Sequence, residues 1–292
     1  MNTFLEKLLA ERPIVTDGAW GTQIQQLGLE PGACPDAWNL EDAAAIERVA
    51  RSYVDAGSRI ILTNTFGANR LMLERHGLAD KAAAINRTGA EISRIAVSDK
   101  AYVFGSMGPS GKMIFTGEVS QDELRDAFEE QALALAEGGA HGLVIETMSE
   151  LAEARIALRA AQKTGLPVVV SMAYDSGTAY DRTMMGITPE EAAEELRNAG
   201  ADVIGANCGM GIEFIEPILK RLRAVTSLPI WIKPNAGMPE FRDGKVTYNV
   251  RPEQFAASAL RIRAAGADFI GGCCGTNPEF IRAIKKVFAE RL

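Results

Sequence analysis

The chain has 292 residues, with 31 basic and 38 acidic side chains and a formal net charge of −7. This acidic balance gives no basic surface for nucleic acid or for an anionic membrane, and an apolar share of 47% is ordinary for a folded chain. No apolar run approaches the roughly 18 residues that a membrane helix needs. We therefore expect a cytoplasmic chain that binds neither nucleic acid nor membrane.

Eight short apolar runs alternate with longer segments of helical period along the chain. The predicted strands are Ile14–Thr16, Arg59–Thr63, Tyr102–Gly105, Gly142–Glu146, Val168–Met172, Val203–Ala206, Ile230–Lys233 and Phe269–Gly272. Each run is nearly continuous, as expected for parallel strands that are buried on both faces. The predicted helices are Ala43–Ala56, Ala79–Ser98, Gln121–Glu137, Glu150–Thr164, Glu190–Ala199, Glu213–Val225 and Pro252–Ala265.

Local signals support these boundaries. Ser120–Glu123 and Thr188–Glu191 have the composition of helix capping boxes. Gly57, Gly139, Gly200 and Gly266 each stand between a predicted helix and a predicted strand, where a left-handed glycine commonly ends the helix; these four positions form a faint repeat.

Eight strand–helix units in about 250 residues fit a single (β/α)₈ TIM-type barrel. We therefore predict one barrel domain over residues 1–292. A doubly wound sheet is the alternative, although that fold commonly has fewer strands.

Three of the four cysteines follow predicted strands, at the end of the barrel where active sites lie. Cys208 follows the sixth strand, and Cys273 and Cys274 follow the eighth. Three thiolates from two strand ends can hold one tetrahedral zinc ion and leave its fourth position open. A substrate thiol bound there would be deprotonated and nucleophilic, which favours alkyl transfer to sulfur.

Other interpretations of the cysteines stay open at this point. A lone cysteine is usually a small buried hydrophobic residue, which is the expectation for Cys34. Adjacent cysteines can form a vicinal disulfide, so a redox protein is an alternative to a zinc enzyme. Spacing alone weighs zinc and these alternatives about equally.

The segments Gly271–Thr276, Gly205–Gly209 and Asp17-Gly18 resemble the homocysteine S-methyltransferase family. The resemblance extends over most of the chain and also includes Asn64–Phe66, Gly108-Pro109, Glu146-Thr147 and Pro234–Gly237. It implies that Cys208, Cys273 and Cys274 bind Zn²⁺. It also implies that the chain methylates the thiol of homocysteine, giving methionine.

The resemblance further implies a site for the amino-acid part of homocysteine. Asp17 and Glu146 are expected to face its ammonium group. The Gly18-Ala19 turn is expected to donate backbone hydrogen bonds to its carboxylate. Asn207 and Asn235 are expected to orient the substrate or to bond the zinc thiolates, unless they cap local turns.

The aromatic residues Trp20, Trp38 and Phe66 are expected on the side of the methyl donor. Cation–π attraction would suit a quaternary ammonium or sulfonium donor there, and packing of a long loop is the alternative role. His76 and His141 are expected to be structural. No partner residues beside them suggest a catalytic triad.

Two segments resemble different branches of the family. Residues 183–186 and 238–242 look most like bacterial betaine-type enzymes, and Pro234–Gly237 also looks like the homocysteine module of cobalamin-dependent methionine synthase. We expect a freestanding enzyme that uses a small onium donor, either betaine or a sulfonium. The alternative is a thiol-activating subunit that takes the methyl group from a separate corrinoid protein. Homo-oligomer formation stays open.

Overall fold

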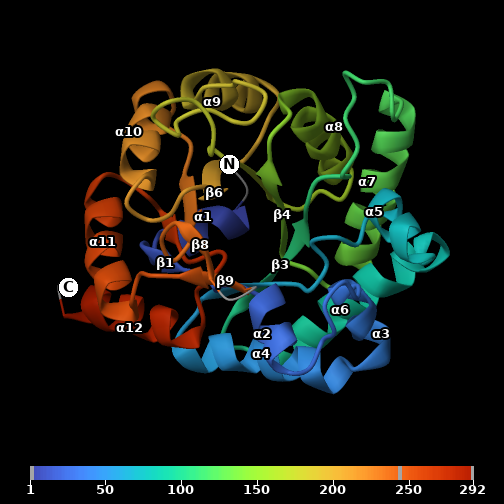
Figure 1. Cartoon of the computed structure of the whole chain (residues 1–292), viewed down its shortest axis with the longest axis horizontal. Helices are drawn as coiled ribbons and strands as arrows, with labels where there is room; N and C mark the ends of the chain where they lie inside the picture. The colour runs from blue at the N-terminus through green and yellow to red at the C-terminus, as the bar shows by residue number, and fades with distance from the viewer. Residues whose placement is uncertain (1–2, 243–244, 291–292) are drawn as a thin grey trace.

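The computed structural model describes residues 3–242 and 245–290. All eight predicted runs form strands of one parallel sheet in the order β1-β10-β7-β6-β5-β4-β3-β2. The sheet curls into a nearly closed barrel with the long helices packed around it (Figure 1). The predicted (β/α)₈ barrel is therefore confirmed.

The barrel strands are β1 (Ile14–Val15), β2 (Ile60–Leu62), β3 (Tyr102–Met107), β4 (Gly142–Met148), β5 (Val168–Met172), β6 (Val203–Cys208), β7 (Ile230–Pro234) and β10 (Phe269–Ile270). A separate antiparallel hairpin of β8 (Pro239–Arg242) and β9 (Lys245–Tyr248) interrupts the connection after β7. The sequence analysis did not predict this hairpin, because its strands are short and carry charges instead of a continuous apolar run.

The helices are α1 (Thr3–Leu9), α2 (Gly21–Gln26), α3 (Trp38–Glu41), α4 (Ala43–Ala56), α5 (Arg70–Leu73), α6 (Ala82–Val97), α7 (Gln121–Glu137), α8 (Leu151–Gln162), α9 (Pro189–Asn198), α10 (Ile215–Val225), α11 (Pro252–Ala264) and α12 (Pro278–Ala289). Short 3₁₀ turns cover Pro35–Ala37, Glu74–His76 and Ala79–Lys81. The short helices α2, α3 and α5 and the final helix α12 were not predicted from the sequence. Among the described helices, none is long and apolar enough to cross a membrane.

The predicted helix boundaries are confirmed where local chemistry specifies them. Ser120 and Thr188 form capping boxes at the starts of α7 and α9. The four glycines that precede strands all have positive φ angles, for example 101° at Gly57 and 89° at Gly200. These backbone conformations are accessible to glycine without a side-chain clash, so each glycine allows the chain to turn from helix to strand.

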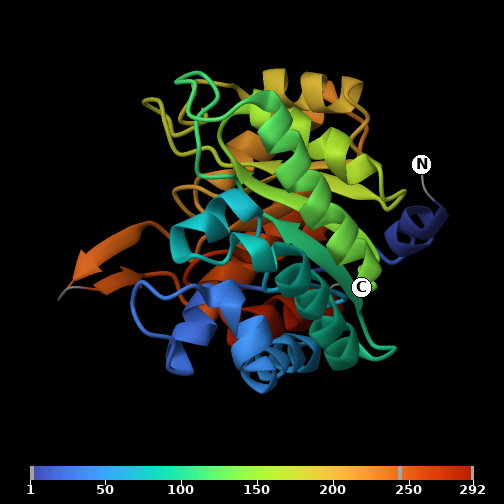
Figure 2. The ribbon, with the colours of Figure 1, turned by 90° about the vertical axis from the view of Figure 1, so that its right-hand side faces the viewer.

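The half of the barrel interior at the amino ends of the strands, here called the lower layer, is apolar. The barrel strands contribute a cluster of buried side chains there: Ile14, Ile60, Leu62, Phe104, Val144, Val169, Val203, Trp231 and Phe269. Leu5, Leu8 and Leu9 of α1 complete this cluster. Figure 2 shows α1 and the β8–β9 hairpin at opposite ends of the barrel. The amino ends of the strands are therefore closed by packed hydrocarbon.

The half of the interior at the carboxyl ends of the strands, here called the upper layer, is polar. Because side chains two residues apart on a strand point to the same side, the residues two positions beyond the apolar layer also face inward. They include the buried polar residues Thr16, Ser106, Glu146, Ser171 and Lys233. The change from apolar to polar occurs within one alternation along the strands.

The seam between β1 and β2 is held differently from the other strand pairs. The backbone N–H of Arg59 donates to the Val15 carbonyl over 2.7 Å. Further up, the Leu62 N–H donates to the Asp17 Oδ2 atom over 2.7 Å. A carboxylate thus replaces a backbone carbonyl as the acceptor where the barrel closes.

Candidate functional site

The three cysteines predicted as metal ligands come together at the carboxyl end of the barrel. Cys208 ends β6, and Cys273 and Cys274 lie just beyond β10, after Gly271 and Gly272. Their sulfur atoms all lie within 4.8 Å of one another, and all three thiols are free. That spacing suits sulfur ligands at about 2.3 Å around a single ion. Cys34 lies apart, buried in a small cluster with Leu73 and Ile85.

Crowding of the three thiols opposes their ionisation. The hydrogen bond with Cys208 raises the pKa of Cys273 well above the usual thiol range, and burial adds to the increase. A bond with Cys273 lowers the pKa of Cys208, but the contact with Cys274 and burial outweigh it and raise that pKa to about 11. Three neighbouring thiolates therefore need a cation to offset their charge.

Asn235 supplies a second sign of a cation site. Its Nδ2 atom donates to the Gly209 carbonyl over 2.7 Å, and its side chain also bonds Cys208. Its Oδ1 atom is buried and has no hydrogen-bond partner among the described residues. A buried carbonyl oxygen without a donor is uncommon, and a metal ion beside Cys208 would satisfy it. The residues present therefore fit a metal held by three sulfur atoms.

One member of the cysteine cluster and one residue near it have a strained backbone. Thr147 and Cys208 have φ angles of 63° and 62°. A β-branched residue in this left-handed region is a genuine outlier, and such strain clusters at functional sites. The Asn207 Oδ1 atom accepts from the Thr147 N–H over 2.9 Å, and its Nδ2 atom donates to the Thr147 Oγ1 atom over 2.7 Å. Asn207 thus holds Thr147 in place from behind the cavity wall.

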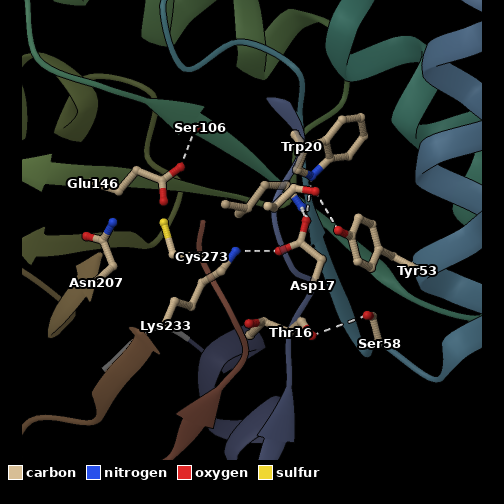
Figure 3. A network of polar contacts seen from close by, with 12 residues as sticks. Thr16, Asp17, Trp20, Tyr53, Ser58, Ser106, Glu146, Asn207, Lys233 and Cys273 are labelled. Atoms are coloured by element: carbon tan, nitrogen blue, oxygen red, sulfur yellow. Dashed lines mark hydrogen bonds and ion pairs between the residues drawn. The ribbon is translucent and has the colours of Figure 1, made fainter. Parts of the chain in front are cut away.

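Glu146 presents a carboxylate to the cavity. Ser106 donates its hydroxyl to the Oε1 atom of Glu146 over 2.5 Å (Figure 3). The Oε2 atom has no hydrogen-bond partner in the part of the chain that the structure describes. Burial raises the pKa of Glu146, while the nearby Lys233 ammonium lowers it in part.

Asp17 lies deeper and is fully bonded by the protein. Its Oδ1 atom accepts from Lys233 Nζ over 2.5 Å, and its Oδ2 atom accepts from Trp20 Nε1 and from the Leu62 N–H, both over 2.7 Å (Figure 3). Burial by itself would lower the pKa of Lys233, but the carboxylates of Asp17 and Glu146 raise it above its usual value. Lys233 is therefore a buried cation at the centre of the site.

Sequence reasoning missed Lys233. The signal was present, because a single lysine inside the run Ile230–Pro234 can be buried only with a charged partner. The partner itself lies on a strand that is distant in the sequence. Without the strand order, the sequence does not identify it.

The Gly18-Ala19 turn, predicted to bind the substrate carboxylate, lines the cavity, and part of its polar backbone is bonded within the protein. The Ala19 N–H donates to Thr276 Oγ1 over 3.2 Å, and the Ala19 carbonyl accepts from the Tyr53 hydroxyl over 2.5 Å. A Cβ atom on Gly18 would lie 2.7 Å from Thr276 Oγ1. Close packing against Thr276 therefore requires glycine at this position.

A cavity of about 480 Å³ lies above the cysteines and is lined by Glu146, Lys233 and the three thiol residues among others. Trp20 and Phe66 also line it, and Phe66 is 43% exposed. The structure does not bring Trp38 to this wall, because that residue begins α3 and packs against the hydrophobic core.

The two histidines lie in different places. His76 lies at the rim of the cavity, although the sequence analysis assigned it a structural role. The His141 Nδ1 atom accepts from the Val103 N–H over 3.0 Å, and its ring stacks on Phe4. His141 directly precedes β4 and therefore lies at the amino end of that strand.

Comparisons with known proteins agree with this geometry. The family model described as homocysteine S-methyltransferase matches residues 14–288. Curated relatives named methionine synthase, from Mycobacterium leprae and Mycobacterium tuberculosis, are 33% and 32% identical over 99% of this chain. The matched region is only 25% and 26% of those proteins, so the chain spans about a quarter of their length.

Solved structures share the fold. The homocysteine methyltransferase MmuM from Escherichia coli, in its oxidized form, has a TM-score of 0.82 at 23% identity and covers 98% of this chain and 100% of its own. Its metallated form has the same TM-score at 24% identity and covers 97% of this chain and 99% of its own. At this level of identity, the likeness concerns the fold.

Proposed function

Because this chain belongs to the homocysteine S-methyltransferase family, we propose that it transfers a methyl group from a small onium donor to the thiol of homocysteine, giving methionine. The observation that carries the proposal is the cluster of three free thiols beneath a cavity that also presents Glu146. A thiol cluster can bind a metal ion, and a carboxylate can bind the ammonium group of an amino-acid substrate.

Cys208, Cys273 and Cys274 would hold a zinc ion in this proposal. With three sulfur ligands, zinc would leave one position for the homocysteine sulfur and would keep that sulfur deprotonated at neutral pH. The buried Oδ1 atom of Asn235 lies beside Cys208 and could hold that fourth position until the homocysteine sulfur takes it. The strained backbone at Cys208 fixes one sulfur donor before any substrate enters.

The residues around the metal position the substrate. Glu146 Oε2 accepts the ammonium group of homocysteine, and Ser106 fixes the orientation of that carboxylate through Oε1. Asn207 keeps Thr147 rigid beside Glu146. A charge-assisted bond at a fixed carboxylate gives both affinity and orientation.

The donor side of the cavity is proposed to take a small cation. The rings of Trp20 and Phe66 line the wall and can attract a quaternary ammonium or a sulfonium through their faces. The Asp36 carboxylate also lines the cavity. Its Oδ1 atom accepts a hydrogen bond from the Gly67 N–H over 3.0 Å. Betaine and a sulfonium are the donors that fit this chemistry.

A second candidate donor is a methyl-carrying corrinoid protein. Exposed apolar side chains lie on several loops that follow the carboxyl ends of the barrel strands: Phe66, Met113, Phe115, Met184, Met185 and Met238. A macromolecular carrier would cover such side chains, which a small donor leaves in water. The relatives named methionine synthase extend far beyond the matched region, in agreement with a larger assembly.

One experiment separates the two donors. Zinc-loaded protein is given homocysteine with glycine betaine, S-methylmethionine, dimethylsulfoniopropionate or methylcobalamin, and methionine is quantified. We expect turnover with one onium donor. Turnover only with the corrinoid would replace the small donor by the carrier, and no methionine from any of the four would contradict the proposal. C273A should lose both the metal and activity. C34S is the matched control for metal binding and should keep the metal, because Cys34 lies outside the thiol cluster although it also lines the cavity.

A further inference from the structure

The ion pair between Lys233 and Asp17 makes the two buried carboxylates of the site unequal. Asp17 has no exposed surface, and both of its oxygen atoms accept hydrogen bonds from the protein. Glu146 uses one oxygen atom for Ser106 and lines the cavity together with Lys233. A ligand in the cavity therefore meets Glu146 and the lysine, while the Asp17 carboxylate lies behind them.

The charges lead to the same distinction. Lys233 and Asp17 neutralise each other at 2.5 Å, with side chains that are 3% and 0% exposed. Glu146 forms no salt bridge among the described residues, although the Lys233 ammonium is near enough to act on its pKa. Figure 3 shows the Cys273 sulfur between Glu146 and Lys233. Glu146 is thus the carboxylate beside the proposed metal site that has no ion-pair partner of its own among the described residues.

Asp17 also has a structural role, because it bonds two other strands, and a bound substrate would disturb these bonds. Its Oδ2 atom accepts from Leu62 on β2, and its Oδ1 atom accepts from Lys233 on β7. The carboxylate therefore joins three strands at the point where the barrel closes. An ammonium group could bind Asp17 only by competing with a buried, charged hydrogen bond, which is strong in this environment.

We propose that Lys233 is a positioning residue that gives the two carboxylates separate roles. It holds Asp17 in the barrel seam and leaves Glu146 as the single acceptor for the ammonium group of homocysteine. This inference rests on the proposed function and refines its substrate site. It replaces the expectation, drawn from the family resemblance, that both carboxylates face the ammonium group.

The test compares two thiols in calorimetric titrations of zinc-loaded protein without a methyl donor. The thiols are homocysteine and 4-mercaptobutyrate, which has the same thiol and carboxylate but no amino group. The readout is the ratio of their affinities. E146Q should lower this ratio at least about tenfold, because it removes a charged hydrogen bond. E194Q, an exposed change on α9, is the matched control and should keep the ratio.

The role of Lys233 is tested in two double variants. D17N/K233M removes both members of the ion pair together, so no unpaired charge is left buried, and it should keep the ratio within about threefold. K233M/E146Q frees the Asp17 Oδ1 atom, and it should recover part of the ratio that E146Q loses. K220M, which removes an exposed lysine bonded to Glu216, is the control for the lysine change and should recover nothing.

The outcomes separate this inference from the function on which it rests. If D17N/K233M lowers the ratio as much as E146Q does, or if K233M/E146Q shows no recovery, the division of roles is wrong while homocysteine binding stands. If the wild-type protein binds neither thiol, the proposed function fails and takes this inference with it. Circular dichroism of each variant identifies any loss of fold before the ratios are compared.

Discussion

Trp231 and Lys233 lie two residues apart on the same strand and face the same barrel interior, yet their surroundings are opposite. Trp231 packs among Phe104 and Phe269 in the lower layer, with ring centroids 6.2 and 5.3 Å away. Lys233 bonds Asp17 in the upper layer. One alternation of a strand thus separates a layer that stabilises the barrel from a layer that carries its chemistry.

The difference shows why the two layers respond differently to substitution. The lower layer is held by hydrocarbon contacts, so a lost side chain leaves a cavity and lowers the free energy of unfolding. The upper layer is held by hydrogen bonds and charges of fixed geometry. A lost group there affects the placement of ligands first.

Substitutions in the thiol cluster should cause the greatest loss of activity in the upper layer. C208A, C273A and C274A should each lose the bound metal and all measurable methionine formation, because two sulfur donors hold zinc much less well than three. Metal analysis and turnover on the same samples check this. A variant that remains active without zinc would contradict the role given to the cluster.

A substitution in the lower layer should lower the stability of the fold and leave activity nearly unchanged. F104A should lower the free energy of unfolding by about 3–5 kcal/mol, since a fully buried aromatic side chain is replaced by a cavity. Urea denaturation measures this loss. Turnover at 25 °C, where the variant remains folded, should stay within about threefold of wild type; a selective loss of activity in folded protein would show that the layers are not separable.

An intermediate effect is expected for the clamp on Thr147. N207A removes the bonds that hold Thr147 at its positive φ angle, and release of that strain is worth about 1–3 kcal/mol. Activity should fall roughly tenfold with little change in metal content. N207A/T147G should recover part of the loss, because glycine adopts this backbone without strain. If glycine gives no recovery, strain at Thr147 is not what Asn207 controls.

The effect that is smallest at neutral pH is a pH dependence of the unfolding free energy from Asp36. Burial raises its pKa from 3.8 to about 6, so the folded chain holds a proton that the unfolded chain releases between those values. The contribution of this proton to the free energy of unfolding is complete below about pH 4 and is lost as the pH rises through about 6. It amounts to about 1.4 kcal/mol for each unit of difference between the two pKa values. D36N should flatten the unfolding free energy over this range. An unchanged slope in the variant would show that Asp36 does not cause it.

The sequence predicted the lower layer better than the upper one. Continuous apolar runs and helix-stopping glycines specify strands and turns locally, so all eight barrel strands and every long described helix except α12 were predicted. The hairpin β8–β9 carries no such run. Trp38 shows the limit for single residues, because its aromatic character says nothing about whether it faces a cavity or the core.

The three cysteines are the part of the candidate site that could be predicted from the sequence. The paired cysteines and Cys208 come together because strand ends of a barrel meet at one face, which follows from the fold alone. The partners of Asp17 do not follow from the fold class. Lys233 and Leu62 reach Asp17 through the order of the strands and the open seam between β1 and β2, which are set by tertiary packing.

The most direct test of the central claim is an absorption titration of cobalt-substituted protein with homocysteine. We expect the sulfur-to-cobalt charge-transfer band to be present with the three cysteines alone and to grow to saturation as homocysteine adds a fourth sulfur. Methionine, whose sulfur carries a methyl group, should not reproduce this increase. A band that stays unchanged at saturating homocysteine would show that the thiol does not bind at the three-cysteine site.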